Sequence, residues 1–184
     1  NEAKKVELNK TTFESLSRSE GSGGCMSLAH ESGQGLTMTM DECVFSICSV
    51  TDNSADGFGG GAVFASFRAG MSLTLKNSTF ETCTAPTAED TGRGGGIYLV
   101  LGAYEAFFSI ETPIFRSNEA WKGKDVFVAS PNIDGTAVGS RFPFFETDDE
   151  GKWDEDSLAG MNKTAESSGS IVDLGTLLDK VSDT

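Results

Sequence analysis

The first 130 residues of the chain repeat one pattern with a period of about 35 residues, and this repeat constrains the fold more than any other feature. It is anchored by a phenylalanine that recurs at spacings of 32, 35 and 35 residues, as Phe13, Phe45, Phe80 and Phe115. Two apolar residues stand seven and five positions before each anchor, as the pairs Val6/Leu8, Met38/Met40, Leu73/Leu75 and Phe108/Ile110. Apolar residues at alternate positions are typical of a strand with one buried face.

A glycine run recurs with nearly the same period. Aligned on the last glycine of each run, Gly24, Gly61 and Gly96 are separated by 37 and 35 residues. We expect these runs to form tight corners, where glycine tolerates a positive φ and a close backbone approach. This alignment predicts a further inward-facing ladder formed by Cys25, Ala62 and Ile97.

A fixed period of this length indicates a solenoid, a propeller or an array. The unit has no helical periodicity, and it holds about three short strands, fewer than the four of a propeller blade. We therefore predict an all-β fold: a right-handed parallel β-helix of about three and a half rungs, whose rungs bury apolar surface against their neighbours. Residues 1–130 form this repeat domain, and residues 131–184 form a second segment.

The segment 131–184 does not carry the repeat and is acidic, with 12 acidic and 4 basic residues. Residues 141–145 are apolar enough that we expect them to pack on the solenoid. Apolar residues within 171–181 are spaced by three and four, which predicts a short amphipathic helix, with a strand added to a sheet edge as the alternative. The segment therefore either packs on the solenoid or extends from it.

The four cysteines are interpreted through the repeat. Cys48 and Cys83 each follow an anchor phenylalanine by three residues, so they are expected on adjacent rungs, with Asn118 next in line. A Cys48–Cys83 disulfide is one interpretation, and a ladder of small buried thiols is the other, which we favour. Cys25 is assigned to the core, and Cys43 fits no zinc-binding pattern.

Charge and composition restrict the partners. The formal net charge of −14 argues against nucleic-acid binding and against docking on anionic lipid. No run of apolar residues is long enough to span a membrane, so membrane insertion is not expected. Three Asn-x-Ser/Thr sequons, at Asn9, Asn77 and Asn162, mark candidate N-glycosylation sites and favour an extracellular or cell-surface protein.

Polar loops separate each anchor phenylalanine from the next glycine run, at residues 51–58, 84–93 and 119–124. Stacking of the rungs should gather these loops on one edge of the solenoid. Repeat proteins often bind ligands on such an edge.

The repeat also resembles a known family. Gly-Gly-Ala/Ile, alternating Leu-Thr-Leu and Phe-x-x-Asn/Cys together resemble the β-helix repeat of polymorphic outer membrane proteins, found in chlamydial autotransporter passengers and in protist surface proteins. The resemblance covers residues 6–130 and is carried by residues 60–63, 95–98, 45–48, 80–83 and 115–118, while 123–128 look like the closing rung of the protist versions. It implies an extracellular, cell-surface scaffold, often adhesive, with no catalytic residues.

Three hypotheses for function follow. The first is a non-catalytic surface, adhesion or structural module, without a cofactor or metal, whose partner is a carbohydrate or a cell-surface protein. The second is a filament protomer that self-assembles through its solenoid ends or its tail. The third is a polysaccharide lyase or glycoside hydrolase, for which Asp41, Lys76 and Glu111 form the best candidate ladder; a surface ladder of ion pairs is the simpler interpretation.

Overall fold

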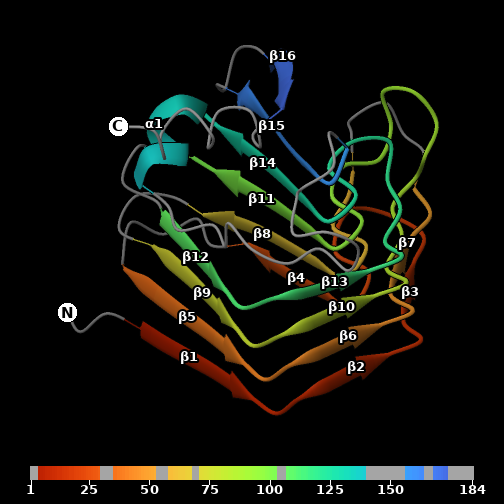
Figure 1. Cartoon of the computed structure of the whole chain (residues 1–184), viewed down its shortest axis with the longest axis vertical. Helices are drawn as coiled ribbons and strands as arrows, with labels where there is room; N and C mark the ends of the chain where they lie inside the picture. The colour runs from red at the N-terminus through yellow and green to blue at the C-terminus, as the bar shows by residue number, and fades with distance from the viewer. Residues whose placement is uncertain are drawn as a thin grey trace.

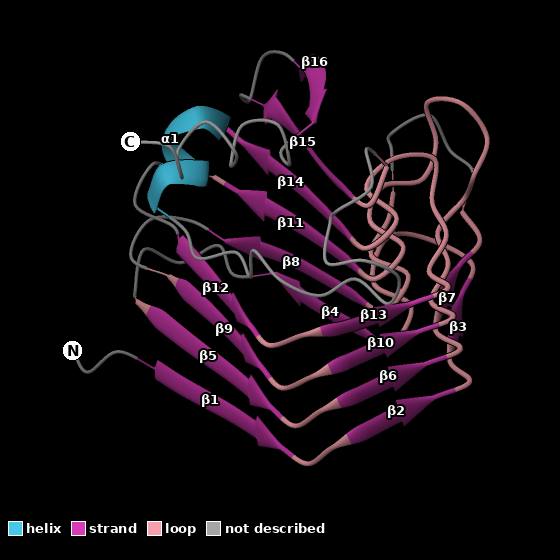
Figure 2. Cartoon of the chain, viewed as in Figure 1, coloured by secondary structure: helices cyan, strands magenta, loops and turns pink. Residues whose placement is uncertain are grey.

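The chain folds into a parallel β-solenoid, described here from a computed structural model (Figures 1 and 2). The structure describes residues 4–29, 35–52, 58–67, 71–102, 107–139, 156–163 and 168–173. One sheet holds, in spatial order, β1 (Lys4–Asn9), β5 (Leu36–Asp41), β9 (Ser72–Lys76) and β12 (Phe107–Glu111). A second sheet holds β2 (Thr12–Glu14), β6 (Val44–Ser46), β10 (Thr79–Glu81) and β13 (Ile114–Arg116).

The remaining sheets close each turn. β3 (Ser17–Arg18) and β7 (Ser49–Val50) form a short two-stranded sheet. The largest sheet contains β4 (Met26–Ala29), β8 (Val63–Phe67), β11 (Ile97–Leu101), β14 (Val126–Ser130), β15 (Leu158–Lys163) and β16 (Ser168–Asp173). In Figure 1 the chain runs from left to right through β5 and β6 and returns behind them through β8 as the coil rises, so the solenoid is right-handed.

Strand register confirms the ladders inferred from the repeat spacing. Val6 pairs with Met38, Met38 with Leu73, and Leu73 with Phe108. The anchor phenylalanines follow the same rule, and their rings stack face to face along the solenoid, with neighbouring centroids 4.9, 4.9 and 5.1 Å apart. Each turn therefore places chemically similar side chains directly on top of one another, and the spacing of parallel strands sets the distance between the rings.

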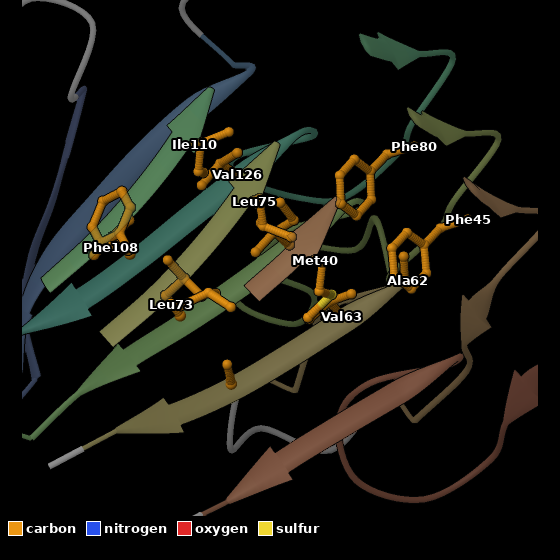
Figure 3. Close-up of a cluster of buried hydrophobic side chains, with 14 of the residues drawn as sticks. Met40, Phe45, Ala62, Val63, Leu73, Leu75, Phe80, Phe108, Ile110 and Val126 are labelled. Atoms are coloured by element: carbon orange, nitrogen blue, oxygen red, sulfur yellow. The ribbon is translucent and has the colours of Figure 1, made fainter. Parts of the chain in front are cut away.

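The interior is filled by these ladders (Figure 3). Met40, Leu75 and Ile110 are almost fully buried, as are Phe45 and Phe80 beside them. The opposite wall is lined by inward-facing side chains of the largest sheet, including Val63 and Val126. Burial of a large apolar side chain stabilises by about 1.5–3 kcal/mol, so stacking of the turns is the main stabilising contribution.

The largest sheet is apolar on its outer face as well. Tyr98 and Phe127 are buried there, in a second cluster with Ala129, Ala159 and Met161. Phe64, Tyr98 and Phe127 meet edge to face, at centroid distances of 5.4 and 5.6 Å. The sequence signal was present in the continuous apolar runs 97–101 and 126–129, which are typical of parallel strands buried on both faces.

The glycine corner corrects one predicted ladder. Positive φ angles occur at Gly23, Gly60, Gly94 and Gly123, so the left-handed glycine, rather than the last glycine of each run, aligns the turns. Ile97 consequently pairs with Val63, one position away from the predicted Ala62. A run of three glycines does not reveal from sequence which one takes the left-handed conformation.

The cysteine pairing differs from both interpretations, because Cys48 is neither bonded to Cys83 nor the free thiol that the favoured interpretation expected. Cys48 forms a disulfide with Cys25, with a Cα–Cα distance of 5.5 Å, whereas Cys83 is a buried free thiol, as is Cys43. A Cys48–Cys83 bridge is therefore absent. Neighbours in a parallel ladder point in the same direction, so their sulfur atoms do not face each other; Cys25 approaches Cys48 from the glycine corner with the orientation that a disulfide requires.

The C-terminal segment continues the solenoid. β15 pairs with β14 in parallel, with Val126 opposite Leu158, and β16 then pairs antiparallel with β15. The helix α1 (Ile133–Gly139) lies between β14 and β15 in the chain. The predicted helix over 171–181 is wrong for residues 171–173, which belong to β16, the alternative edge strand; residues 174–181 and the apolar segment 141–145 lie outside the described residues.

Candidate functional site

The candidate site lies where the turns have almost no regular structure. After the short strands β3 and β7, adjacent turns are held by single parallel bridges, Ser49 to Thr84 and Thr84 to Glu119. The N–H of Val50 donates to the Thr84 carbonyl at 2.9 Å, and that of Ala85 donates to the Glu119 carbonyl at 2.8 Å. The described residues that follow these bridges belong to the predicted loops, so on the described part of the chain the loops start side by side on one edge, while residues 53–57 of the first loop lie outside the described residues.

A groove with a volume of about 390 Å³ opens at this edge. It is lined by Val50, Thr51, Glu119 and the segment 84–88. Because Thr51, Thr84 and Glu119 belong to three successive turns, the groove follows the direction of stacking. None of these residues was singled out individually from the sequence, although each lies in or beside one of the predicted loops.

The chemistry of the groove is mixed. Val50 and Ala85 are buried and provide apolar surface, while Thr51, Thr87 and Glu119 are more accessible. The hydroxyl groups donate and accept hydrogen bonds, and the carboxylate of Glu119 accepts them. No lysine or arginine is among the lining residues. This arrangement suits a neutral, hydroxyl-bearing ligand better than an anionic one.

Backbone hydrogen bonds hold the loop that forms one wall. The N–H of Trp121 donates to the Pro86 carbonyl at 3.0 Å, and the N–H of Lys122 donates to the Gly92 carbonyl at 3.3 Å. Within the loop, the N–H and the hydroxyl of Thr91 both donate to the carbonyl of Ala88. These contacts tie the loop to the next turn, so this wall is formed before any ligand binds, which lowers the entropic cost of binding.

The candidate catalytic ladder is a different surface feature. Asp41 pairs with Lys76 in register, and Lys76 forms an ion pair with Glu111, with Nζ and Oε2 3.2 Å apart. Asp41 instead accepts a hydrogen bond from Asn77 Nδ2 at 3.0 Å. Of the three charged groups, Lys76 and Glu111 therefore form the ion pair that the simpler interpretation of a surface ladder predicts, whereas the hydrogen bond of Asp41 is with Asn77.

Cys83 is the titratable group with the clearest perturbation. Burial raises the pKa of its thiol to about 11, because desolvation disfavours the thiolate. Its sulfur donates to the Phe45 carbonyl at 3.4 Å. A thiol with so high a pKa is a poor nucleophile at neutral pH, so Cys83 acts here as a packed core residue.

The three sequon asparagines lie at separate places. Asn9 ends β1 and is exposed. Asn77 is an exposed corner residue that accepts a hydrogen bond from the Thr112 hydroxyl. Asn162 lies on β15 and accepts the N–H of Ile133 at 2.9 Å. They are therefore distributed over different turns and do not form one cluster.

In the part of the chain that the structure describes, no group of three or more His, Cys, Asp or Glu side chains is placed to hold a metal ion. Among these same residues, no helix combines the length and hydrophobicity needed to cross a membrane.

The fold defines the chain as a parallel β-solenoid protein. Comparison with known proteins found no match: no family model fits the sequence, and no curated protein or solved structure matches it.

Proposed function

We propose that this protein is a non-catalytic, extracellular surface module that binds a carbohydrate or a cell-surface protein through the groove at its loop edge. The observation that carries the proposal is the groove itself, which is lined from three successive turns and bordered by a loop held by backbone hydrogen bonds. Its hydroxyl and carboxylate groups match the hydrogen-bonding needs of a hydroxyl-rich ligand.

The Cys25–Cys48 disulfide supports the extracellular part of the proposal, because disulfides persist in oxidising compartments and are rare in the cytosol. The resemblance to the repeat of polymorphic outer membrane proteins also supports an extracellular location, and it supports an adhesive role. The sequons at Asn9, Asn77 and Asn162 are compatible with N-glycosylation in that compartment.

The groove proposal is tested by glycan-array and cell-binding measurements with the purified chain. We expect binding that falls by up to about tenfold in Glu119→Gln, since glutamine keeps one oxygen acceptor but loses the charge, which makes a hydrogen bond about 1 kcal/mol stronger. Binding should also fall in Thr87→Val. Thr74→Val, on the outer face of β9, is the matched control and should bind like the wild type. Absence of binding, or binding that is unchanged in both groove variants, would contradict the proposal.

A second candidate function is assembly through an end of the solenoid. One observation favours it: the first described turn is more exposed than the turns above it, with Val6 41% exposed on an inward-facing position. Its test is the mass of the purified chain as a function of concentration.

A further inference from the structure

The edge of the solenoid formed by β1 offers backbone groups for pairing. Within the described residues, β1 pairs only with β5. The N–H of Lys4 donates to the Gly35 carbonyl at 3.1 Å, and that of Lys10 donates to the Asp41 carbonyl at 3.0 Å. Backbone groups alternate in direction along a strand, so the N–H and C=O groups of Lys5 and Glu7 point away from β5. β1 therefore presents hydrogen-bonding groups along its outer edge.

Apolar surface accompanies this edge. Val6 is 41% exposed, whereas its ladder equivalents Met38 and Leu73 are 2% and 0% exposed. Leu8 and Phe13 are also only partly buried against the core. In Figure 1, β1 and β2 form the last layer of the stack. The turn has the interior side chains of a solenoid turn without a further layer of described residues beyond them.

We propose that β1 pairs antiparallel with β1 of a second copy of this chain, about a two-fold axis at Val6, to give a closed dimer. In this register Lys5 lies opposite Glu7 of the second copy, and Glu7 lies opposite its Lys5. Both residues direct their backbone groups outward, so each such pair can exchange two backbone hydrogen bonds, as required of a hydrogen-bonded antiparallel pair. The inference deepens the second candidate function, assembly through a solenoid end, and rests on it.

Charge selects this register among its neighbours. The side chains of Lys5 and Glu7 lie on the same outer face of β1 and form an ion pair within one chain, with Nζ and Oε1 2.6 Å apart. A two-fold axis at Lys5 would oppose lysine to lysine, and one at Glu7 would oppose glutamate to glutamate, which is unfavourable on adjacent strands. Only the axis at Val6, among these three, places opposite charges across the interface on both sides.

The same register accounts for the side chains that point inward. Val6 lies opposite Val6 of the second copy in a non-hydrogen-bonded pair, where the strands approach most closely. Lys4 lies opposite Leu8 of the second copy, and its alkyl chain can cover apolar surface while the ammonium group stays in water. Lysines on an edge strand ordinarily oppose pairing; here the facing glutamate converts Lys5 into a complementary partner.

The closing experiment measures mass by sedimentation equilibrium from micromolar to millimolar concentration. We expect a monomer–dimer equilibrium in the wild type. Lys5→Glu and Glu7→Lys should each weaken the dimer by about tenfold or more, because each places two like-charged pairs in the interface. A mixture of these two variants restores opposite charges at both pairs and should form a heterodimer, which excludes loss of folding as the cause.

Each other outcome overturns the dimer. A wild-type monomer at all concentrations, or a dimer that both charge reversals leave unchanged, contradicts it. Growth beyond a dimer contradicts the closed two-fold interface while leaving assembly through a solenoid end in place. A monomer whose Lys5 and Glu7 amides are nonetheless protected from hydrogen exchange means that another segment covers this edge. None of these outcomes bears on ligand binding in the groove, which the glycan array measures separately.

Discussion

Asn118 lies one turn above Cys83, and its side chain forms hydrogen bonds with backbone groups of the turn that contains Cys83. Its Oδ1 accepts the backbone N–H of Cys83 at 2.9 Å. Its Nδ2 donates to the Phe80 carbonyl at 3.1 Å and to Asp125 Oδ1 at 3.0 Å. One buried side chain therefore satisfies two backbone groups of the turn below and fixes an aspartate of its own turn.

Asn118→Leu removes these hydrogen bonds while keeping a similar volume. We expect the free energy of unfolding to fall by about 3 kcal/mol, because buried groups left without partners cost about 1–3 kcal/mol each. Urea denaturation measures the change. Asn9→Ala, at an exposed position on β1, is the control and should change stability by less than about 0.5 kcal/mol. An equal decrease in the free energy of unfolding in both variants would show that the buried hydrogen bonds of Asn118 do not stabilise the protein.

Reduction of the Cys25–Cys48 disulfide should lower the free energy of unfolding by about 3 kcal/mol, because the bridge closes a loop with a sequence separation of 23 and restricts the unfolded chain. Denaturation with and without a reductant measures this. A Cys25→Ala/Cys48→Ala variant should be insensitive to reductant, and Cys83→Ala should keep the full response. Loss of the response in Cys83→Ala would instead indicate a bridge that involves Cys83.

Stability should fall in mild alkali because of Cys83. Burial raises the pKa of its thiol to about 11 from 9.0, so in this range the unfolded chain loses the thiol proton before the folded chain does. The contribution is complete below pH 9 and is lost as the pH rises to 11, by about 2–3 kcal/mol at most. Denaturation from pH 8 to 11 should show a steeper decline for the wild type than for Cys83→Ala. Parallel declines would contradict the assignment.

Ile47→Gly should stabilise the protein. Ile47 has a φ of 54° and is 54% exposed, so it takes a left-handed conformation that costs a side-chain-bearing residue about 1–2 kcal/mol and protects little apolar surface. We expect the midpoint of thermal unfolding to rise. Ile114→Gly is the matched control: Ile114 lies in β13 and is 39% exposed, and the substitution should lower the midpoint. A decrease in both variants would show that the strain at Ile47 is relieved in another way.

The phenylalanine stack should contribute unequally along its length. Phe80 is fully buried between Phe45 and Phe115, whereas Phe13, in the first turn, is only partly buried. Phe80→Leu should cost about 1–2 kcal/mol more than Phe13→Leu, because more packing is lost in the closed interior. Chemical denaturation compares the two. Equal costs at low protein concentration would mean that the first turn is covered as completely as the third.

Most of the repeat fold could be predicted from the sequence. The recurrence of Phe13, Phe45, Phe80 and Phe115, with alternating apolar residues before each, requires strands to stack with those residues in register. A one-residue slip would turn every apolar side chain outward, so this local pattern determines the register of two sheets without further information. The register predicted from the repeat was wrong at the glycine corner. Ile97 pairs there with Val63 rather than Ala62, because the left-handed glycine sets the alignment of the turns.

The groove could be located from the sequence only as a loop edge. Its lining brings together Thr51, Thr84 and Glu119 from three successive turns, and the conformation of the residues around them has no periodic signal in the sequence. β15 was missed as a continuation of the solenoid because residues 158–163 lack the anchor phenylalanine and the glycine run. Pairing with β14 satisfies the backbone hydrogen-bonding groups of β15, and this pairing does not require the side chains of the repeat.

The sequence by itself determined the class of fold and the interior ladders of the two sheets that contain β5 and β6, because a period-two pattern repeated at a constant interval leaves few ways to bury its apolar residues. The tertiary structure alone decided that Cys48 pairs with Cys25 rather than Cys83 and that a groove forms across three turns. Both depend on how side chains from different parts of the solenoid are oriented toward one another. The repeat spacing in the sequence does not specify this orientation.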